Sequence, residues 1–228
     1  MPIQTKKFSG FTGNQLKLIA LISMTCDHVG LQLFPDVLIL RILGRLAYPI
    51  FAYMIAEGCR YTRNRKKYLL RMASLAVVCQ VVYFVAMGSL YQCILVTFSL
   101  SIGLIYAMDA WQNRGDTASR VLAMGMLAAV FVLCVVLPDF LPGFEIDYGL
   151  MGVLLPVLIY FGRPAHHFLL AGLILLCFAY GGLQWWCLAA IPLLGQYNEQ
   201  RGKYNIGKLF YIYYPVHLVV IYGLSLLK

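Results

Sequence analysis

Long apolar runs alternate with short polar segments along the whole chain. Most of the runs approach the roughly 20 residues that an α-helix needs to cross a bilayer. They lack the two-residue alternation that is typical of membrane β-strands. The pattern predicts about nine membrane-spanning helices, at Leu18–Phe34, Val37–Glu57, Leu69–Met87, Tyr91–Trp111, Val121–Leu137, Tyr148–Phe161, Phe168–Tyr180, Leu183–Gln196 and Leu209–Leu227.

The composition agrees with a membrane protein. Hydrophobic residues make up 61% of the 228 residues, and charged residues make up only 12%. Soluble domains carry roughly 25% charged residues, so this chain has too few polar side chains to cover a water-soluble globule. We predict an all-α, polytopic helical bundle in which residues 1–228 form a single transmembrane domain.

The net charge of +9 comes mainly from basic residues in the short segments between apolar runs. The densest stretch covers residues 60–71, whereas the segment with Asp139, Glu145 and Asp147 contains no Lys or Arg. Because basic loops stay on the cytoplasmic side of a membrane, we predict that the N-terminus is inside and the C-terminus outside. The same distribution argues for the lipid bilayer, and against nucleic acid, as a partner.

Three polar side chains lie deep inside the first and last predicted spans. Asp27 and His28 are in the first and His217 is in the last, and a charge in mid-membrane costs roughly 2.5–3.5 kcal/mol on insertion scales. At about 1.5 Å per residue, both histidines lie roughly 14–16 Å above the inner surface. Such residues usually mark functional sites, although helix–helix hydrogen bonding is the alternative. Tyr213 and Tyr214 share a helix face with His217, which suits proton transfer.

The second predicted span carries two arginines, Arg41 and Arg45, on one helix face, and Tyr48 continues this stripe. Pro49 follows, and its ring leaves the carbonyl of Arg45 without a helical donor. A guanidinium at this depth can hold an oxyanion, a carboxylate or a phosphate. The alternative is snorkelling toward the outer head groups. Glu57, near the inner edge, is expected to pair with a cation of the basic loop.

No further catalytic or metal-binding motif stands out. The chain lacks HExxH, GxSxG and GxGxxG, so we expect no metal. None of the seven cysteines forms a CxxC pair, and most lie in apolar runs, where small packing residues are the ordinary interpretation. His166 and His167 fall in a short polar loop and are expected to be solvated.

Four blocks of sequence resemble the TraX family of membrane proteins, which is named for a conjugative-plasmid protein that acetylates pilin. The blocks are LKLIALISMTCDHVG at Leu16–Gly30, RILGRLAYPIF at Arg41–Phe51 running on into AEGCRYTRNRKKYLLR at Ala56–Arg71, DYG at Asp147–Gly149 with Gly152, and YN at Tyr197-Asn198 followed by KLFYIYYPVHL at Lys208–Leu218. Any one block is weak evidence. Four blocks in order, covering most of the chain, are specific.

The resemblance implies a bacterial inner-membrane acetyltransferase that takes its acetyl group from acetyl-CoA. The acceptor would be an amine or hydroxyl on pilin or on another cell-envelope molecule, at or beyond the membrane midplane. The family's motif positions fall here on Asp27, His28, Arg41, Arg45, Glu57, Asp147, Tyr214 and His217. A small transporter and a non-catalytic membrane component of a conjugation or pilus apparatus are the alternative functions.

With this resemblance the polar residues acquire expected roles. His28 or His217 would act as general base. Asp27 would orient an imidazole or stabilise its cation, and Arg45 would stabilise the developing oxyanion. The expected substrate-binding residues are Arg41, Tyr48, Asp147, Tyr213 and Tyr214. The phosphates of acetyl-CoA need cations on the inner face, which we expect from Arg60, Arg63, Lys66, Lys67 and Lys208. Topology and anionic-lipid binding would explain these basic residues equally well.

Overall fold

The computed structural model describes residues 10–163, 167–203 and 207–227, and these ranges are helical with no strand beyond two isolated bridges. The α-helices are α1 (Gly13–Gln32), α2 (Leu38–Gly44), α3 (Ala47–Tyr61), α4 (Arg65–Met87), α5 (Ile94–Arg114), α6 (Thr117–Phe131), α7 (Leu137–Phe140), α8 (Gly149–Gly162), α9 (His167–Tyr180), α10 (Ile191–Gly195) and α11 (Gly207–Ser225). A π-helix, η1 (Val132–Val136), joins α6 to α7, and a 3-10 helix, η2 (Gly182–Ala190), precedes α10. The predicted all-α class is confirmed.

Four helical segments within the described ranges are long and apolar enough to cross a membrane. They are Leu38–Tyr61, Arg65–Val85, Ile94–Arg114 and Thr117–Phe140. Shorter apolar helices cover Gly149–Gly162, His167–Tyr180, Gly182–Gly195 and Ile212–Ser225. Each predicted span coincides with one helix or with two or three joined helices. The number of nine spans stays a prediction, because a 14-residue helix such as α8 is only about 21 Å long.

The second predicted span is broken between α2 and α3, at Arg45 and Leu46. Pro49 explains the break, because it cannot donate a backbone hydrogen bond to the carbonyl of Arg45. Tyr48 lies at the start of α3, whereas Arg41 lies in α2 and Arg45 in the turn between the two helices. The hydroxyl of Tyr48 donates to the carbonyl of Gly152 on α8, at 2.7 Å.

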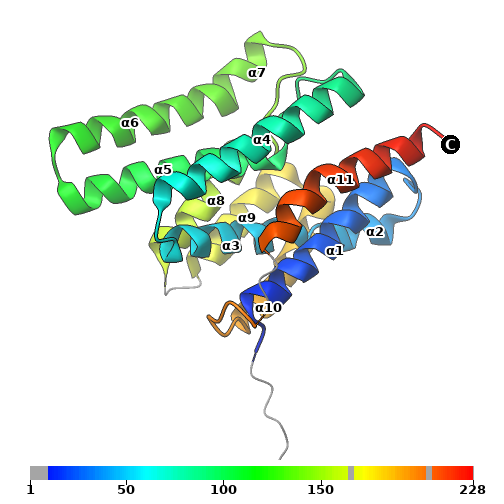
Figure 1. Ribbon diagram of the computed structural model, residues 1–228, viewed down its shortest axis with the longest axis horizontal. Helices are drawn as coiled ribbons and strands as arrows, with labels where there is room; N and C mark the ends of the chain where they lie inside the picture. Colours follow the sequence, from blue (N-terminus) through cyan, green and yellow to red (C-terminus); the bar gives the residue numbers. More distant parts are fainter. Residues whose placement is uncertain (1–9, 164–166, 204–206, 228) are drawn as a thin grey trace, which may run out of the picture.

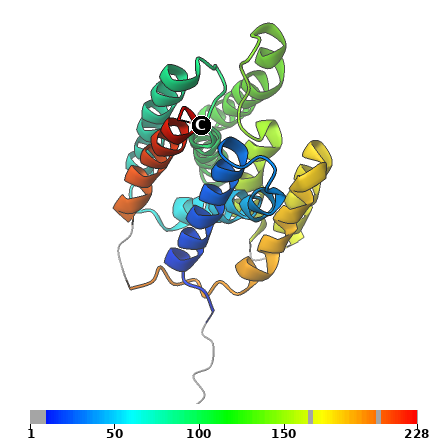
Figure 2. The ribbon, with the colours of Figure 1, turned by 90° about the vertical axis from the view of Figure 1, so that its right-hand side faces the viewer.

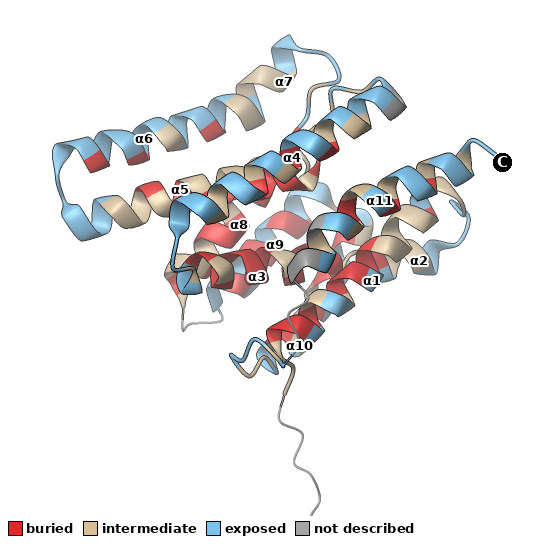
Figure 3. Ribbon diagram, viewed as in Figure 1, coloured by how far each residue is buried: buried red, intermediate tan, exposed pale blue. Residues whose placement is uncertain are grey.

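Helix α3 lies at the centre of the bundle. Ile50, Ala52 and Ala56 on this helix are completely buried, as are Leu16 and Ala20 on α1. Half of the span that contains α3 is buried inside the protein, compared with 11% of the span Thr117–Phe140. Figure 3 shows this contrast between the buried interior and the exposed surfaces of α4 and α6. The exposed side chains there are largely aliphatic, which is what a bilayer would cover.

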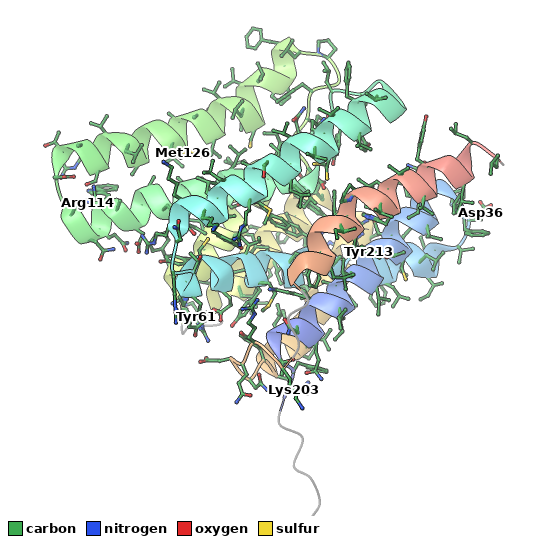
Figure 4. All side chains as sticks on the ribbon, viewed as in Figure 1. Asp36, Tyr61, Arg114, Met126, Lys203 and Tyr213 are labelled. Atoms are coloured by element: carbon green, nitrogen blue, oxygen red, sulfur yellow. The ribbon has the colours of Figure 1, made fainter. Side chains whose placement is uncertain are left out.

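Basic residues gather at one end of the bundle. Most of the described Lys and Arg residues lie in the connections α3–α4, α5–α6 and α8–α9, in the helical turns that flank these connections, and in the segment after α10. In Figure 4, Tyr61, Arg114 and Lys203 mark this side, which we call the basic end, and Asp36 marks the opposite, outer end. Tyr213 lies between the two ends. The charge asymmetry is the one on which the predicted orientation rests.

Helix α11 packs beside both α1 and α4 (Figures 1 and 2). It therefore joins the last helix of the chain to the first, and places residues near 215 next to residues near 28. On its other side α1 packs against α2 and α3. Helix α1 is thus the element that carries polar side chains toward two separate neighbours.

Candidate functional site

Asp27 and His28 on α1 face different helices. Adjacent residues on an α-helix point about 100° apart, so the two side chains cannot both face one neighbour. Asp27 contacts α2 and the turn after it, whereas His28 contacts α11. The polar residues of the predicted spans therefore form two clusters, one on each side of α1.

The first cluster, which we call the arginine cluster, consists of Asp27, Arg41, Arg45 and Gln184. Nη1 of Arg41 lies 2.7 Å from Oδ2 of Asp27, and Nη2 of Arg45 bonds to Oδ1. The three ionised side chains are only 14–22% exposed. Gly44 permits this close approach, because a Cβ at that position would overlap the carboxylate of Asp27. The cluster is a partly buried ion-pair network whose geometry depends on a glycine.

This geometry corrects the role that we expected for Asp27. Both of its carboxylate oxygens are occupied by guanidinium groups, and no hydrogen bond to either imidazole is found in the described part of the chain. Arg45 also turns away from the histidines. Its Nη1 donates to Oε1 of Gln184 at 3.4 Å, and its Nε donates to the carbonyl of Arg41 at 3.4 Å. Asp27 therefore holds the two arginines instead of orienting a histidine.

The second cluster, which we call the histidine cluster, brings together the two histidines that the sequence analysis singled out. Nδ1 of His28 lies 2.8 Å from Nε2 of His217, and the two ring planes are nearly parallel, at 8°. Nδ1 of His217 lies 3.0 Å from the carbonyl oxygen of Tyr213, one helical turn earlier. The residues come from opposite ends of the chain, so only the packing of α11 against α1 creates this contact.

The hydrogen-bond network assigns the tautomer of each ring. A carbonyl oxygen only accepts, so Nδ1 of His217 carries a hydrogen, which it donates to Tyr213. In the neutral ring Nε2 of His217 is then an acceptor, and Nδ1 of His28 must donate to it. Nε2 of His28 is consequently left with a lone pair. The cluster presents one imidazole nitrogen that can accept a proton.

Tyr213 and Tyr214 flank His217 without donating hydrogen bonds to it. The hydroxyl of Thr25 donates to the carbonyl of Leu21 at 2.8 Å, so it accepts from the Tyr213 hydroxyl at 2.6 Å. The Tyr213 ring lies parallel to that of His217, with centroids 5.2 Å apart, and the Tyr214 ring meets it edge-on. The two tyrosines therefore fix the position of the His217 ring, and Tyr213 adds its backbone carbonyl.

A small pocket opens beside His28, between α1, α4 and α11. It is lined by His28, Gln32, Val82, Tyr83, Leu218, Val219, Ile221 and Tyr222. Gln32 lies one helical turn beyond His28 toward the outer end, and Tyr83 lies in the last turns of α4. The pocket thus extends from the histidine cluster into the outer half of the bundle.

Asp147 lies in the connection between α7 and α8, and its contacts tie this connection to α5. Its carboxylate accepts from the hydroxyl of Tyr91 at 2.6 Å, and its carbonyl accepts from Thr97 at 2.7 Å. Burial raises the pKa of Asp147 to about 6; the charge of Asp27 adds to the shift, whereas the Tyr91 hydrogen bond opposes it. Asp147 is therefore a partly buried carboxylate with a protein partner, and not a freely solvated one.

The residue after Asp147, Tyr148, stands in a left-handed conformation, with φ at 57°. Few residues other than glycine adopt this conformation, and its cost concentrates at sites where the surroundings impose it. Here the Tyr148 ring stacks on Tyr48, with centroids 4.1 Å apart. Tyr48 thus supports the DYG segment instead of reaching the histidine cluster.

The basic end contains both paired and unpaired cations. Arg163 lies 2.6 Å from Oε1 of Glu57 and also pairs with Glu199. Arg60 pairs with Glu57 at 3.7 Å and donates to the carbonyl of Tyr160 at 2.6 Å. Glu57 therefore pairs with Arg60 of the basic stretch, as we expected, and also with Arg163, which lies outside that stretch. Its Oε2 is buried and accepts no hydrogen bond from any described residue.

Of the cations expected to bind acetyl-CoA, Arg63, Lys66 and Lys67 are exposed and form no ion pair with any described carboxylate. Arg60 is held by Glu57 and Tyr160, so it is less available for a phosphate. The side chain of Lys208 lies outside the described residues. His166, which we expected to be solvated, also lies outside them, and His167 is exposed as expected.

Three residues of the site escaped the sequence analysis. Thr25 and Gln32 share α1 with the histidine, and Gln184 lies in η2 beside Arg45. All three are polar residues within predicted apolar runs, which is the signal that drew attention to His28. A search of the apolar runs for uncharged polar residues, as well as for charged residues and histidines, would have identified them.

Comparison with known proteins identifies the family of this chain. A family model described as TraX protein matches residues 12–225. The chain belongs to the TraX family. The confirmed family supports the earlier resemblance, because the match covers nearly the whole chain.

Two curated relatives match shorter stretches. "Probable fimbrial assembly protein FimC, serogroup H1" of Dichelobacter nodosus is 38% identical over 77 residues, which is 32% of this chain and 32% of that protein. "Uncharacterized protein RP591" of Rickettsia prowazekii is 53% identical over 38 residues, which is 17% of this chain and 15% of that protein. The chain thus covers a third or less of the length of these relatives. No solved structure matches.

Proposed function

We propose that this TraX-family chain is an integral membrane acetyltransferase. It transfers an acetyl group from acetyl-CoA, bound at the basic end, to an amine or hydroxyl acceptor at or beyond the membrane midplane. The observation that carries this proposal is the contact between His28 and His217, which leaves Nε2 of His28 available as a proton acceptor beside a pocket.

The histidine cluster suits general-base catalysis. The acceptor's proton moves to Nε2 of His28, and the resulting positive charge is shared through the Nδ1 hydrogen bond with His217. His217 in turn donates to the carbonyl of Tyr213, whose partial negative charge favours a positive ring. The His28–His217 and His217–Tyr213 hydrogen bonds therefore both strengthen when His28 becomes protonated.

The donor binds with its nucleotide on the inner face. Arg63, Lys66 and Lys67 are exposed cations at the basic end and suit the phosphates of acetyl-CoA. The pantetheine arm is long and thin, so the thioester reaches the histidine cluster while the phosphates stay at the basic end. Arg45, held by Asp27, stays within the arginine cluster and orients η2 through Gln184.

The proposal includes the membrane arrangement and the biological setting. We propose nine spans in a bacterial inner membrane, with the N-terminus inside and the C-terminus outside, in accord with the charge difference between the two ends. The name of the D. nodosus relative, a probable fimbrial assembly protein, supports pilin or another cell-envelope molecule as the acceptor.

The test compares histidine variants of the purified protein. His28→Ala and His217→Ala are each expected to lower acetyl transfer by at least about 100-fold, because general-base catalysis contributes roughly 10²–10⁴-fold. The control is His167→Ala, which alters an exposed histidine at the start of α9 and should leave turnover near that of the unaltered protein. Transfer is measured as labelled acetyl leaving acetyl-CoA for the membrane fraction.

Thermal unfolding in detergent separates a chemical role from a structural one. An unpaired buried polar group is itself destabilising, so His28→Gln and His217→Gln, which retain hydrogen-bonding side chains, are measured alongside. Folded variants that have lost transfer support the proposal. Near-normal turnover in both alanine variants contradicts it, and so does loss of transfer that merely follows loss of folded protein in all four variants.

A further inference from the structure

We propose that the pocket beside His28 receives a neutral alcohol carried on an apolar stem, so that the reaction is O-acetylation of an acceptor taken from the bilayer. The inference rests on the proposed function and narrows it, because it selects the hydroxyl from the two acceptor groups considered. The occupant is a lipid-like amphiphile with a hydroxyl head group.

The chemistry of the pocket wall carries the inference. Four of its residues, Val82, Leu218, Val219 and Ile221, are aliphatic, and the others present an imidazole, an amide and two phenols. Among the described residues that line it, none is Asp, Glu, Lys or Arg. The pocket therefore offers hydrogen bonds to a neutral group and has no counter-charge for an ion.

Two partly buried carboxylates, those of Asp27 and Asp147, have partners outside the pocket. Asp27 lies on another side of α1 from the pocket and holds Arg41 and Arg45. Asp147 accepts a hydrogen bond from Tyr91. An aliphatic amine or a protein α-amino group is mostly protonated at neutral pH. Such an ammonium would enter the pocket without a partner, and burying an unpaired charge is unfavourable. A hydroxyl meets no such barrier.

The position of the pocket explains how the alcohol arrives. Its walls come from α4 and α11, whose outward faces are apolar and exposed, with Val219 54% exposed and Val81 58% exposed. An apolar stem lying between these two helices stays in the hydrocarbon of the bilayer. Gln32, Tyr83 and Tyr222 then provide hydrogen-bonding groups for the head group close to His28.

The transfer step balances with the groups named. The hydroxyl proton moves to Nε2 of His28 as the hydroxyl oxygen forms a bond to the acetyl carbonyl carbon. The bond between that carbon and the sulfur of acetyl-CoA breaks, and the coenzyme A sulfur takes the proton from His28 as it leaves. The products are the acetate ester and coenzyme A thiol, and the step consumes no other reactant.

The test supplies defined acceptors to the full-length protein in lipid nanodiscs, with labelled acetyl-CoA at neutral pH. The acceptors are dodecanol, dodecylamine, glycerol and a membrane-embedded peptide with a free N-terminus. Dodecyl acetate is expected as the main product, with transfer to the amine and the peptide at least about tenfold slower because the charged amine must first lose its proton. Glycerol, which lacks an apolar stem, should remain unmodified.

Pocket variants provide matched controls. Val219→Trp fills the pocket and should lower transfer to dodecanol, whereas Val220→Trp alters a neighbour of similar exposure that does not line the pocket and should leave it unchanged. Gln32→Glu is nearly isosteric and places a carboxylate beside His28. It should shift the preference from dodecanol toward dodecylamine by about tenfold or more, because the carboxylate pairs with the ammonium.

The possible outcomes separate the inference from the proposed function. Preference of the unaltered protein for the amine or for the peptide overturns the inference and leaves the acetyltransferase in place. Equal effects of the two tryptophan variants also overturn it, because they mean that the pocket does not receive the acceptor. If acetyl leaves acetyl-CoA in none of the arms while the protein remains folded, the proposed function itself fails.

Discussion

Replacing Asp27 by Asn should destabilise the protein more than it disturbs the chemistry. The carboxylate of Asp27 balances two guanidinium groups, those of Arg41 and Arg45. His28 faces another side of α1, where it contacts His217. The asparagine retains the shape of the side chain and removes its charge. Gly44 packs directly against this side chain, because a Cβ at position 44 would overlap the Asp27 carboxylate.

The magnitude follows from the burial of the cluster. Removing one partner of a buried ion pair costs roughly 3–5 kcal/mol. The side chains of the cluster keep 14–22% exposure, so solvent screens part of the charge, and we expect about 3 kcal/mol, the lower end of that range. For a protein of this size such a loss lowers the melting temperature by roughly 6–12 °C.

The assay is thermal unfolding of the purified protein in detergent. Cys26→Ala, which alters the preceding residue and removes no ion pair, is the control and should melt near the unaltered protein. The double variant Asp27→Asn/Arg41→Gln should regain part of the loss, because it removes one of the two unbalanced charges. An Asp27→Asn protein that melts like the unaltered protein but has lost transfer would refute the structural role of Asp27.

Two further predictions concern Asp147 and the membrane orientation. Because the pKa of Asp147 is raised from 3.8 to about 6, the folded state binds this proton more tightly than the unfolded state; the free energy of unfolding should fall by about 3 kcal/mol as pH rises through this window. Asp147→Asn should lack that fall in a comparison of detergent melting curves, and identical pH profiles would contradict the assignment. Reporters active on only one side of the membrane, fused at Lys228 and after Arg65, should report opposite sides, whereas the same side for both would exclude an odd number of spans.

Much of the fold could be predicted from the sequence because apolar runs are long and the chain has few charges. The second span was predicted as one helix, although Pro49 marked the carbonyl of Arg45 as lacking a helical donor, and this is the point at which α2 ends and α3 begins. The 3-10 geometry of η2 could not be predicted in the same way. It begins at Gly182, directly after Gly181, and both glycines have positive φ. The local sequence pattern there resembles that of any short apolar helix.

The site was predictable in its members and less so in its pairing. His28 and His217 were singled out at similar depth in the first and last predicted spans, but their contact depends on the packing of α11 against α1. The partners of Asp27 could not be predicted either, because adjacent helical residues face different neighbours and only tertiary packing decides which helix lies on which side. The contact of Tyr48 with Gly152 likewise depends on tertiary packing, because Gly152 lies on α8, about a hundred residues further along the chain.

Sided acetyl transfer in native membranes tests the central claim most directly. Right-side-out and inverted vesicles from the host retain the natural acceptor, and vesicles from a strain lacking this chain give the background. Labelled acetyl-CoA does not cross the membrane, so it reaches the basic end only in inverted vesicles. The account predicts label in the membrane fraction of inverted vesicles alone, abolished by His28→Ala. Equal labelling from both faces, or labelling that persists in the His28→Ala protein, would contradict it.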